Sequence, residues 1–117
     1  MKWIKFKDIE QQIRPDQRTV RKLIKQELGI EIANLQILFV THPPGLQEHL
    51  HSHQQSFEIL YFFDKAHYKI NGNDYEIQEN DVIIFEPKDV HGAIPIPHEV
   101  RILVVQLPAI TDDKKYE

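Results

Sequence analysis

Cysteine is absent from this sequence of 117 residues. Disulfide bonds, thiolate zinc sites, iron–sulfur ligation and cysteine nucleophiles are therefore all excluded. The chain does contain seven histidines. Any metal ion that it binds must be held by nitrogen and oxygen ligands.

The sequence also lacks a long hydrophobic run. Its first ten residues, MKWIKFKDIE, alternate charged with apolar residues and do not form the continuous apolar stretch of a signal peptide. No later run approaches the length that is needed to span a bilayer. We therefore expect a cytoplasmic protein with no membrane partner.

Basic residues are not in excess, because the formal net charge is −4. Binding along a nucleic-acid backbone would need a basic stripe that neutralises phosphates. The basic residues between positions 14 and 25 are interleaved with acidic and apolar ones, which is typical of a solvated surface. We expect no nucleic-acid partner.

The composition is that of one globular domain. The hydrophobic content of 41% and the charged content of 27% are ordinary for such proteins, and no repeat or Ser/Gly linker divides the chain. We predict a single domain over residues 1–117. Within it, residues 1–34 form an N-terminal strand or arm region, residues 35–107 form the main body, and residues 108–117 form a loosely held polar tail.

From about residue 35 onward, short apolar runs are separated by turn signals. The predicted strands lie in NLQILFVTH, FEILYFF, HYKI, DYEI, DVIIF and VRILVVQL. The NGN sequence at residues 71–73 separates two alternating segments, which is a strong hairpin signal. Many short strands with such turns predict an all-β protein, built as an antiparallel sandwich or barrel.

Residues 16–28 are open to two interpretations. One face of a helix would hold Val20, Leu23, Ile24 and Leu28. Asp16 would be its N-cap and Gly29 would end it. The segment TVRKLI fits a strand that enters the barrel equally well. We prefer the strand because the rest of the chain is predicted to be all-β.

Residues 48–53, EHLHSH, place His49, His51 and His53 at every second position. In a strand these three rings would project from one face, where neighbouring imidazoles can occupy adjacent positions around a metal ion. Glu58 follows His53 at an odd spacing. It can join the site only if the sequence QQS at residues 54–56 forms a turn or bulge that resets the register.

His91 is the fourth candidate ligand, because the predicted strand over 82–85 runs into a Pro-containing turn that delivers it. Three neutral imidazoles and one carboxylate around a divalent cation give a site of net charge +1. Such a site suits oxygen-loving or borderline first-row metals and attracts anionic substrates.

These residues resemble the conserved motifs of the cupins. Residues 45–58 are similar to the first motif, which is Gly, five residues, His-x-His, three or four residues and Glu; residues 80–91 are similar to the second, which ends in His. The resemblance implies a small antiparallel jelly-roll β-barrel that holds one divalent metal ion (Fe, Mn, Ni, Co or Zn) at His51, His53, Glu58 and His91. Because cupins of this size commonly dimerise, it also implies a homodimer.

The departures from the cupin pattern fall on structural positions. Lys65, Asn80 and Lys88 stand where the family has glycine, and Glu86 stands where it has proline. Asn80 tolerates a positive φ angle better than most residues, so we expect the turn at that position to be kept.

Other polar residues are weaker candidates for the site. Tyr61, Tyr68 and Gln106 are candidate substrate contacts, since ligand pockets contain few polar anchors. His49 is either a partly exposed strand residue or a partner of the metal ligands. By sequence alone, Glu48, His49 and Tyr61 are the nearest candidates for a general acid or base. The remaining histidines, His42, His67 and His98, are interpreted as ordinary.

Three functions are compatible with this pattern. A six-coordinate ion would keep two positions for substrate or O₂, which predicts a metal-dependent enzyme of dioxygenase, isomerase or lyase type acting on a small, oxygen-rich, anionic metabolite. A second function is a non-catalytic module that binds a sugar or another metabolite for sensing or storage. A third is a structural barrel, because a tetrahedral zinc ion with four protein ligands would be closed.

Overall fold

The structure is a computed structural model that describes residues 1–17 and 19–117. Within these residues the chain is almost entirely β-structure. The elements are β1 (Lys2–Ile4), the 3-10 turn η1 (Phe6–Asp8), β2 (Gln12–Ile13), β3 (Thr19–Val20), β4 (Gln36–His42), β5 (His51–His53), β6 (Phe57–Phe62), β7 (Ala66–Ile70), β8 (Asn73–Ile77), β9 (Val82–Phe85), β10 (His91–Ala93), β11 (Val100–Leu107) and β12 (Lys114–Tyr116). No helix among the described residues is long and apolar enough to cross a membrane.

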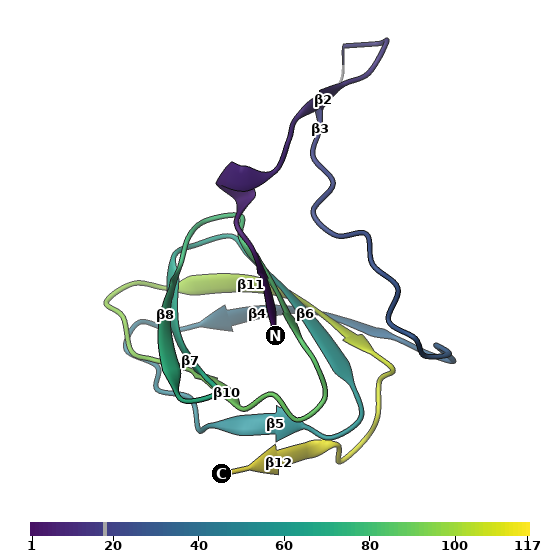
Figure 1. The fold of residues 1–117 in the computed structure, drawn as a ribbon. Helices are drawn as coiled ribbons and strands as arrows, with labels where there is room; N and C mark the ends of the chain where they lie inside the picture. Colours follow the sequence, from purple (N-terminus) through teal and green to yellow (C-terminus); the bar gives the residue numbers. More distant parts are fainter. Residues whose placement is uncertain (18) are drawn as a thin grey trace.

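Two five-stranded antiparallel sheets enclose the core. One has the strand order β1-β9-β6-β11-β4 and the other has the order β12-β5-β10-β7-β8. Figure 1 shows that the two sheets curve around a common interior, with the short sheet of β2 and β3 outside them. The predicted all-β, antiparallel jelly-roll architecture is confirmed.

The alternation of side chains along β6 explains how the barrel is filled. Leu60 and Phe62 are buried, whereas Ile59 and Tyr61 on the opposite face are only partly buried. On the neighbouring β11, Ile102 and Val104 take the corresponding inward positions. Inward side chains of both sheets therefore form one apolar core, as the two-residue period of a strand requires.

Residues in the left-handed backbone conformation define three turns near the site. Asn71 and Gly72 have φ angles of 47° and 85°, which confirms the predicted Asn-Gly hairpin between β7 and β8. Asn80 has a φ of 69°, as its tolerance of positive φ led us to expect. Lys88 has a φ of 74°, a conformation that costs a side-chain-bearing residue about 1 kcal/mol. Its N–H donates to the carbonyl oxygen of His53 at 2.7 Å, which ties this turn to β5.

The N-terminal segment differs from both sequence interpretations. The described residues of this segment, 16–17 and 19–28, form neither a helix nor a barrel strand. Thr19 and Val20 pair with β2 in a small hairpin outside the barrel, and residues 21–28 have no regular structure (Figure 1). Residue 18, inside the segment in question, lies outside the described residues. Asp16 sits in the turn of this hairpin instead of capping a helix. Pairing with β2 holds Thr19 and Val20 in an extended conformation, which is incompatible with a helix at these two positions.

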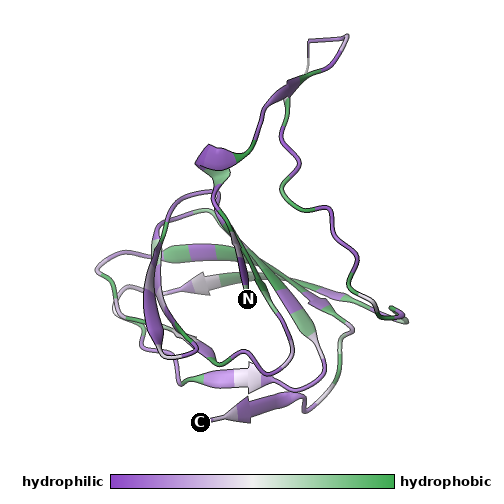
Figure 2. Ribbon diagram, in the orientation of Figure 1, coloured by the Kyte–Doolittle hydropathy of each residue, from purple (hydrophilic) through white to green (hydrophobic). Residues whose placement is uncertain are grey.

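The C-terminal residues 108–117 are not the loosely held tail that the sequence suggested. Lys114, Lys115 and Tyr116 form β12, which pairs with β5 along its whole length. Figure 2 shows that β12 is hydrophilic. It is an edge strand that is held by backbone pairing and not by burial of apolar side chains, so the hydropathy pattern does not reveal it.

Candidate metal centre

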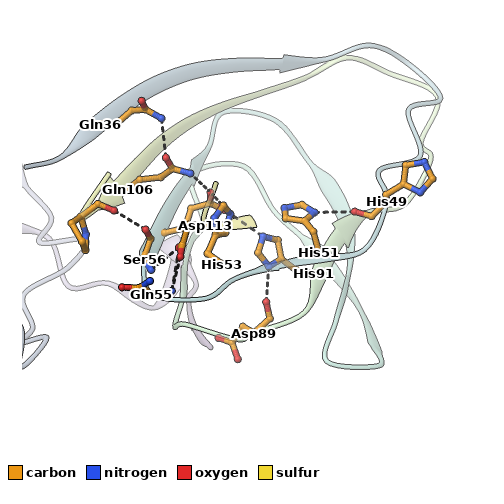
Figure 3. A network of polar contacts seen from close by, with 12 residues as sticks. Gln36, His49, His51, His53, Gln55, Ser56, Asp89, His91, Gln106 and Asp113 are labelled. Carbon is orange, nitrogen blue, oxygen red and sulfur yellow. Dashed lines mark hydrogen bonds and ion pairs between the residues drawn. The ribbon is translucent and has the colours of Figure 1, made fainter. Parts of the chain in front are cut away.

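Three histidines meet at the centre of one sheet. His51 and His53 lie on β5, and His91 at the start of β10 is the direct cross-strand partner of His51. The ring centroids of His51 and His91 are 4.5 Å apart. All three side chains are buried, and one ring nitrogen from each lies within 4.8 Å of the others (Figure 3). This spacing suits three ligands of one metal ion.

Glu58 joins this cluster from the other sheet. Residues 54–56 form a bend between β5 and β6, so the side chain of Glu58 faces the histidines despite its odd spacing from His53. One carboxylate oxygen lies 3.1 Å from His53 Nε2, and the other lies 3.3 Å from His91 Nε2. The structure therefore brings together all four candidate ligands.

The bend at residues 54–56 is held by the C-terminal segment. The carboxylate of the buried Asp113 accepts hydrogen bonds from the backbone N–H groups of Gln55 (3.0 and 3.1 Å) and Ser56 (3.0 Å). The Asp113 carbonyl oxygen accepts a third bond from the N–H of Gln54 at 3.0 Å. The Ser56 hydroxyl donates to the carbonyl oxygen of Pro108 at 2.7 Å. These contacts fix the register between His53 and Glu58.

Backbone carbonyl groups orient two of the imidazole rings. His51 Nδ1 lies 2.9 Å from the carbonyl oxygen of His49, and His91 Nδ1 lies 3.1 Å from that of Asp89 (Figure 3). A proton on each Nδ1 satisfies these contacts and leaves the lone pair of Nε2 directed into the site. Such second contacts are typical of histidines that bind metals.

The buried nitrogens of the cluster fit a metal ion. Among the described residues, the buried side-chain nitrogen and oxygen atoms without a well-formed hydrogen bond are His53 Nε2 and His91 Nε2. Both lie close to the Glu58 carboxylate, but the contacts are not aligned as hydrogen bonds. Buried polar atoms are almost always satisfied, and a cation between these nitrogens and the carboxylate would satisfy all of them.

Close contacts with two histidines keep Glu58 ionised. Burial alone would raise its pKa, but the contacts with His53 and His91 outweigh burial and hold the pKa of Glu58 well below its usual range. Gln106 Nε2 also donates to Glu58 at 3.2 Å, while Gln106 Oε1 accepts a bond from Gln36 at 2.8 Å. Burial lowers the pKa of His51, which favours the neutral imidazole that a metal requires.

A cavity of about 210 Å³ opens beside the cluster. It touches His51, Glu58 and His91 and extends between the two sheets. Its other lining residues are the apolar Leu38, Val40, Leu60, Ile102 and Val104 and the polar His42, Glu48, Tyr68, Gln106 and Lys114. A small molecule in this cavity would lie next to an ion held by the cluster.

Tyr68 and Gln106, two of the candidate substrate contacts, line this cavity, but two other candidates do not. Tyr61 is on the outer face of β6 and donates its hydroxyl to Asn80 Oδ1 at 2.5 Å, so it does not line the cavity. The ring of His49 lies away from the cluster, because β5 begins only at His51 and the alternation predicted from EHLHSH does not include residue 49 (Figure 3). His49 contributes its carbonyl group instead.

The sequence analysis missed two polar residues of the cavity. His42 was interpreted as ordinary, yet it is buried and lines the cavity at the end of β4. Its even spacing from Leu38 and Val40 on a predicted strand was the signal that could have placed it inside. Lys114 carried no such signal, because its position depends on the long-range pairing of β12 with β5.

Solved structures with the same fold include proteins of several kinds. The DMSP lyase DddQ from Ruegeria pomeroyi superposes with a TM-score of 0.63 at 18% identity, over 71% of this chain and 43% of the lyase. A conserved protein with a double-stranded beta-helix domain from Klebsiella pneumoniae has a TM-score of 0.63 at 19% identity, over 80% and 84%. A cupin protein from Bacteroides fragilis has a TM-score of 0.59 at 22% identity, over 68% and 70%.

This chain therefore has the double-stranded β-helix fold of the cupins, and the fold that the sequence motifs implied is confirmed. It spans less than half the length of the Ruegeria lyase. No protein-family model matches the sequence, and no curated protein matches it. At these levels of identity the likeness defines the fold, so the activity must be argued from the site.

Proposed function

We propose that this chain is a metal-dependent enzyme that binds one divalent ion at His51, His53, Glu58 and His91. The ion is Fe, Mn, Ni, Co or Zn, and the substrate is a small, oxygen-rich, anionic metabolite in the barrel. The observation that carries this proposal is the cavity of about 210 Å³ that touches His51, Glu58 and His91. A purely structural site would need no such space beside its ligands.

The donor set supports the reaction class but does not select one reaction. A bound ion would polarise a substrate oxygen as a Lewis acid, in chemistry of dioxygenase, isomerase or lyase type. The chain itself supplies a group for proton transfer. His42 lines the cavity, and burial lowers its pKa against the opposing effect of Glu48, so it is a neutral base at neutral pH.

Elemental analysis tests the metal proposal. Untagged protein that has not been exposed to a chelator should contain close to one equivalent of Fe, Mn, Co, Ni or Zn per chain, because four convergent ligands bind first-row ions tightly. Protein that stays free of metal after each ion has been added back would contradict the proposal.

The alternative is a non-catalytic cupin module that binds a metabolite for sensing or storage. It shares the metal and the cavity with the enzyme and differs only in turnover. Incubation of the metal-loaded protein with small carboxylic acids and O₂, followed by mass spectrometry of the products, separates the two. The cytoplasmic location stays a prediction from the sequence.

We also propose that the partner is a second copy of this chain. It would bind at the outer face of the sheet that contains β4 and β11. Ile37 and Phe39 on β4 are 60% and 63% exposed, and the rings of Phe39 and Phe63 lie 5.7 Å apart. Leu103 of β11 is the cross-strand partner of Phe39 and so shares this face. Among the described residues β4 is also a sheet edge with unpaired backbone groups. An exposed apolar face beside a free sheet edge suits a two-fold dimer, in which the same patch of both copies meets.

The oligomeric state tests this interface. Light scattering should give the mass of a dimer for the unmodified protein, and Phe39→Glu should shift it to the monomer because the charge would be buried without a partner. Ile13→Glu is the matched control, since Ile13 is similarly exposed but lies on the outlying hairpin. A monomeric unmodified protein, or a dimeric Phe39→Glu variant, would contradict the proposed interface.

A further inference from the structure

One cation faces the cavity from the C-terminal strand. In the pairing of β12 with β5, Lys114 lies directly opposite His53, and Tyr116 lies opposite His51. Directly opposed residues of an antiparallel pair share a face of the sheet. The ring of Tyr116 is indeed 6.0 Å from that of His51, and Lys114 lines the cavity. Lys115, the next residue, belongs to the opposite face.

The carboxylates around this cavity already have partners. Glu58 lies against His53 and His91, and Glu48 Oε1 accepts a hydrogen bond from the N–H of Ala93 at 3.1 Å. Across the described part of the chain, Lys114 forms no ion pair, and its Nζ lies 5.6 Å from the centre of the Tyr116 ring. The ammonium group is therefore available to a ligand.

The charge of the cavity then depends on Lys114. The negative charges of Glu48 and Glu58 would balance the two positive charges of a divalent ion. The three metal-bound histidines and His42 would be neutral. Lys114 is the single lysine or arginine among the described lining residues, and it adds one positive charge. A ligand that carries one negative charge would neutralise the cavity, and opposite charges attract most strongly at short range.

The walls of the cavity limit the rest of the ligand. Its volume of about 210 Å³ is below the range of about 300 to 1,000 Å³ that is typical of sites for drug-sized molecules. Leu60, Ile102 and Val104 form an apolar side of the same space. A compact apolar body with a single acidic group fits these two constraints.

We infer that the cavity binds a short-chain monocarboxylate, whose carboxylate is held jointly by the metal ion and by the ammonium group of Lys114. This inference rests on the proposed metal function and replaces the broad class of oxygen-rich anions given there with a monocarboxylate that has a short apolar chain. It assigns Lys114 as a substrate-binding residue that selects for a single negative charge.

Calorimetric titration of Co²⁺-loaded protein with propionate tests the inference. Lys114→Gln should weaken propionate binding by about tenfold or more, because a charge-assisted hydrogen bond is lost. Lys114→Arg should restore most of the affinity, and Lys115→Gln, on the opposite face of the same strand, should bind propionate like the unmodified protein. Propionamide should bind far more weakly than propionate.

Cobalt content, measured for every variant, separates the two proposals. Unmodified protein that takes up Co²⁺ but binds no propionate, or a Lys114→Gln variant that binds it undiminished, would overturn the assignment of Lys114 alone. Equal binding of propionamide and propionate would do the same. Failure of the unmodified protein to take up Co²⁺ would overturn the metal function and this inference with it.

Discussion

The double variant His51→Ala/His53→Ala should lose its metal while keeping its fold. Two of four ligands disappear, and loss of even a supporting contact around a metal typically costs about 10-fold to 100-fold in affinity, so the loss here should exceed about 100-fold. The strands should survive, because the pairing of β5 with β10 and β12 uses backbone groups. Elemental analysis gives the metal content, and circular dichroism reports on the strands.

The matched control for this experiment is His49→Ala. This residue belongs to the same run of histidines, but its ring lies outside the cluster, and the carbonyl group that contacts His51 is kept in the variant. The control should bind metal normally. Stoichiometric metal in the double variant would contradict the assignment of His51 and His53 as ligands. Loss of metal in the control would show that substitutions in residues 48–53 reduce metal binding by disturbing the local structure.

Replacement of Asp113 should have the second largest effect, although this residue touches no ligand atom. Asp113→Ala leaves the buried N–H of Ser56 without its carboxylate acceptor, at a cost of about 1 to 3 kcal/mol, and also removes the acceptor of the N–H of Gln55. The bend at residues 54–56 should loosen, and Glu58 would lose its fixed register. We expect a lower free energy of unfolding and metal affinity reduced by about 10-fold to 100-fold.

Asp113→Asn keeps this prediction testable if the alanine variant does not fold. The amide retains one oxygen acceptor, so this variant should be intermediate in both stability and metal affinity. Lys115→Ala, a change on the exposed outer face of β12, is the control. Its stability and metal affinity should equal those of the unmodified protein. Urea unfolding and metal titration measure the two quantities. Normal metal affinity in a folded Asp113→Ala variant would show that the bend does not depend on this carboxylate.

Local patterns predicted the longer barrel strands well, because these strands have either an alternating or a strongly apolar sequence. FEILYFF and VRILVVQL mark β6 and β11, and the Asn71–Gly72 turn marks the hairpin between β7 and β8. The spacing of His51 and His53 similarly predicted two rings on one face. These features depend on residues that are close together in the sequence, so they can be predicted from the sequence alone.

The features that the sequence did not reveal depend on distant segments. The hydrophilic β12 is a strand only because β5 provides a partner, and Asp113 acts on a bend nearly sixty residues earlier in the chain. The N-terminal hairpin forms by local pairing where the apolar spacing also fitted a helix. Tyr61 was assigned to the site by proximity in sequence, whereas the side of the sheet on which it lies excludes it.

The four proposed ligands come from both layers of the barrel, since Glu58 belongs to the sheet of β6 and the histidines belong to the sheet of β5 and β10. An ion bound by all four would act as a cross-link between the sheets. Binding energy and folding energy are then shared, because any ligand that binds only the native state stabilises it by mass action. The supply of metal would thus set the fraction of molecules in which the two sheets stay packed together, in addition to which ligands the barrel can bind.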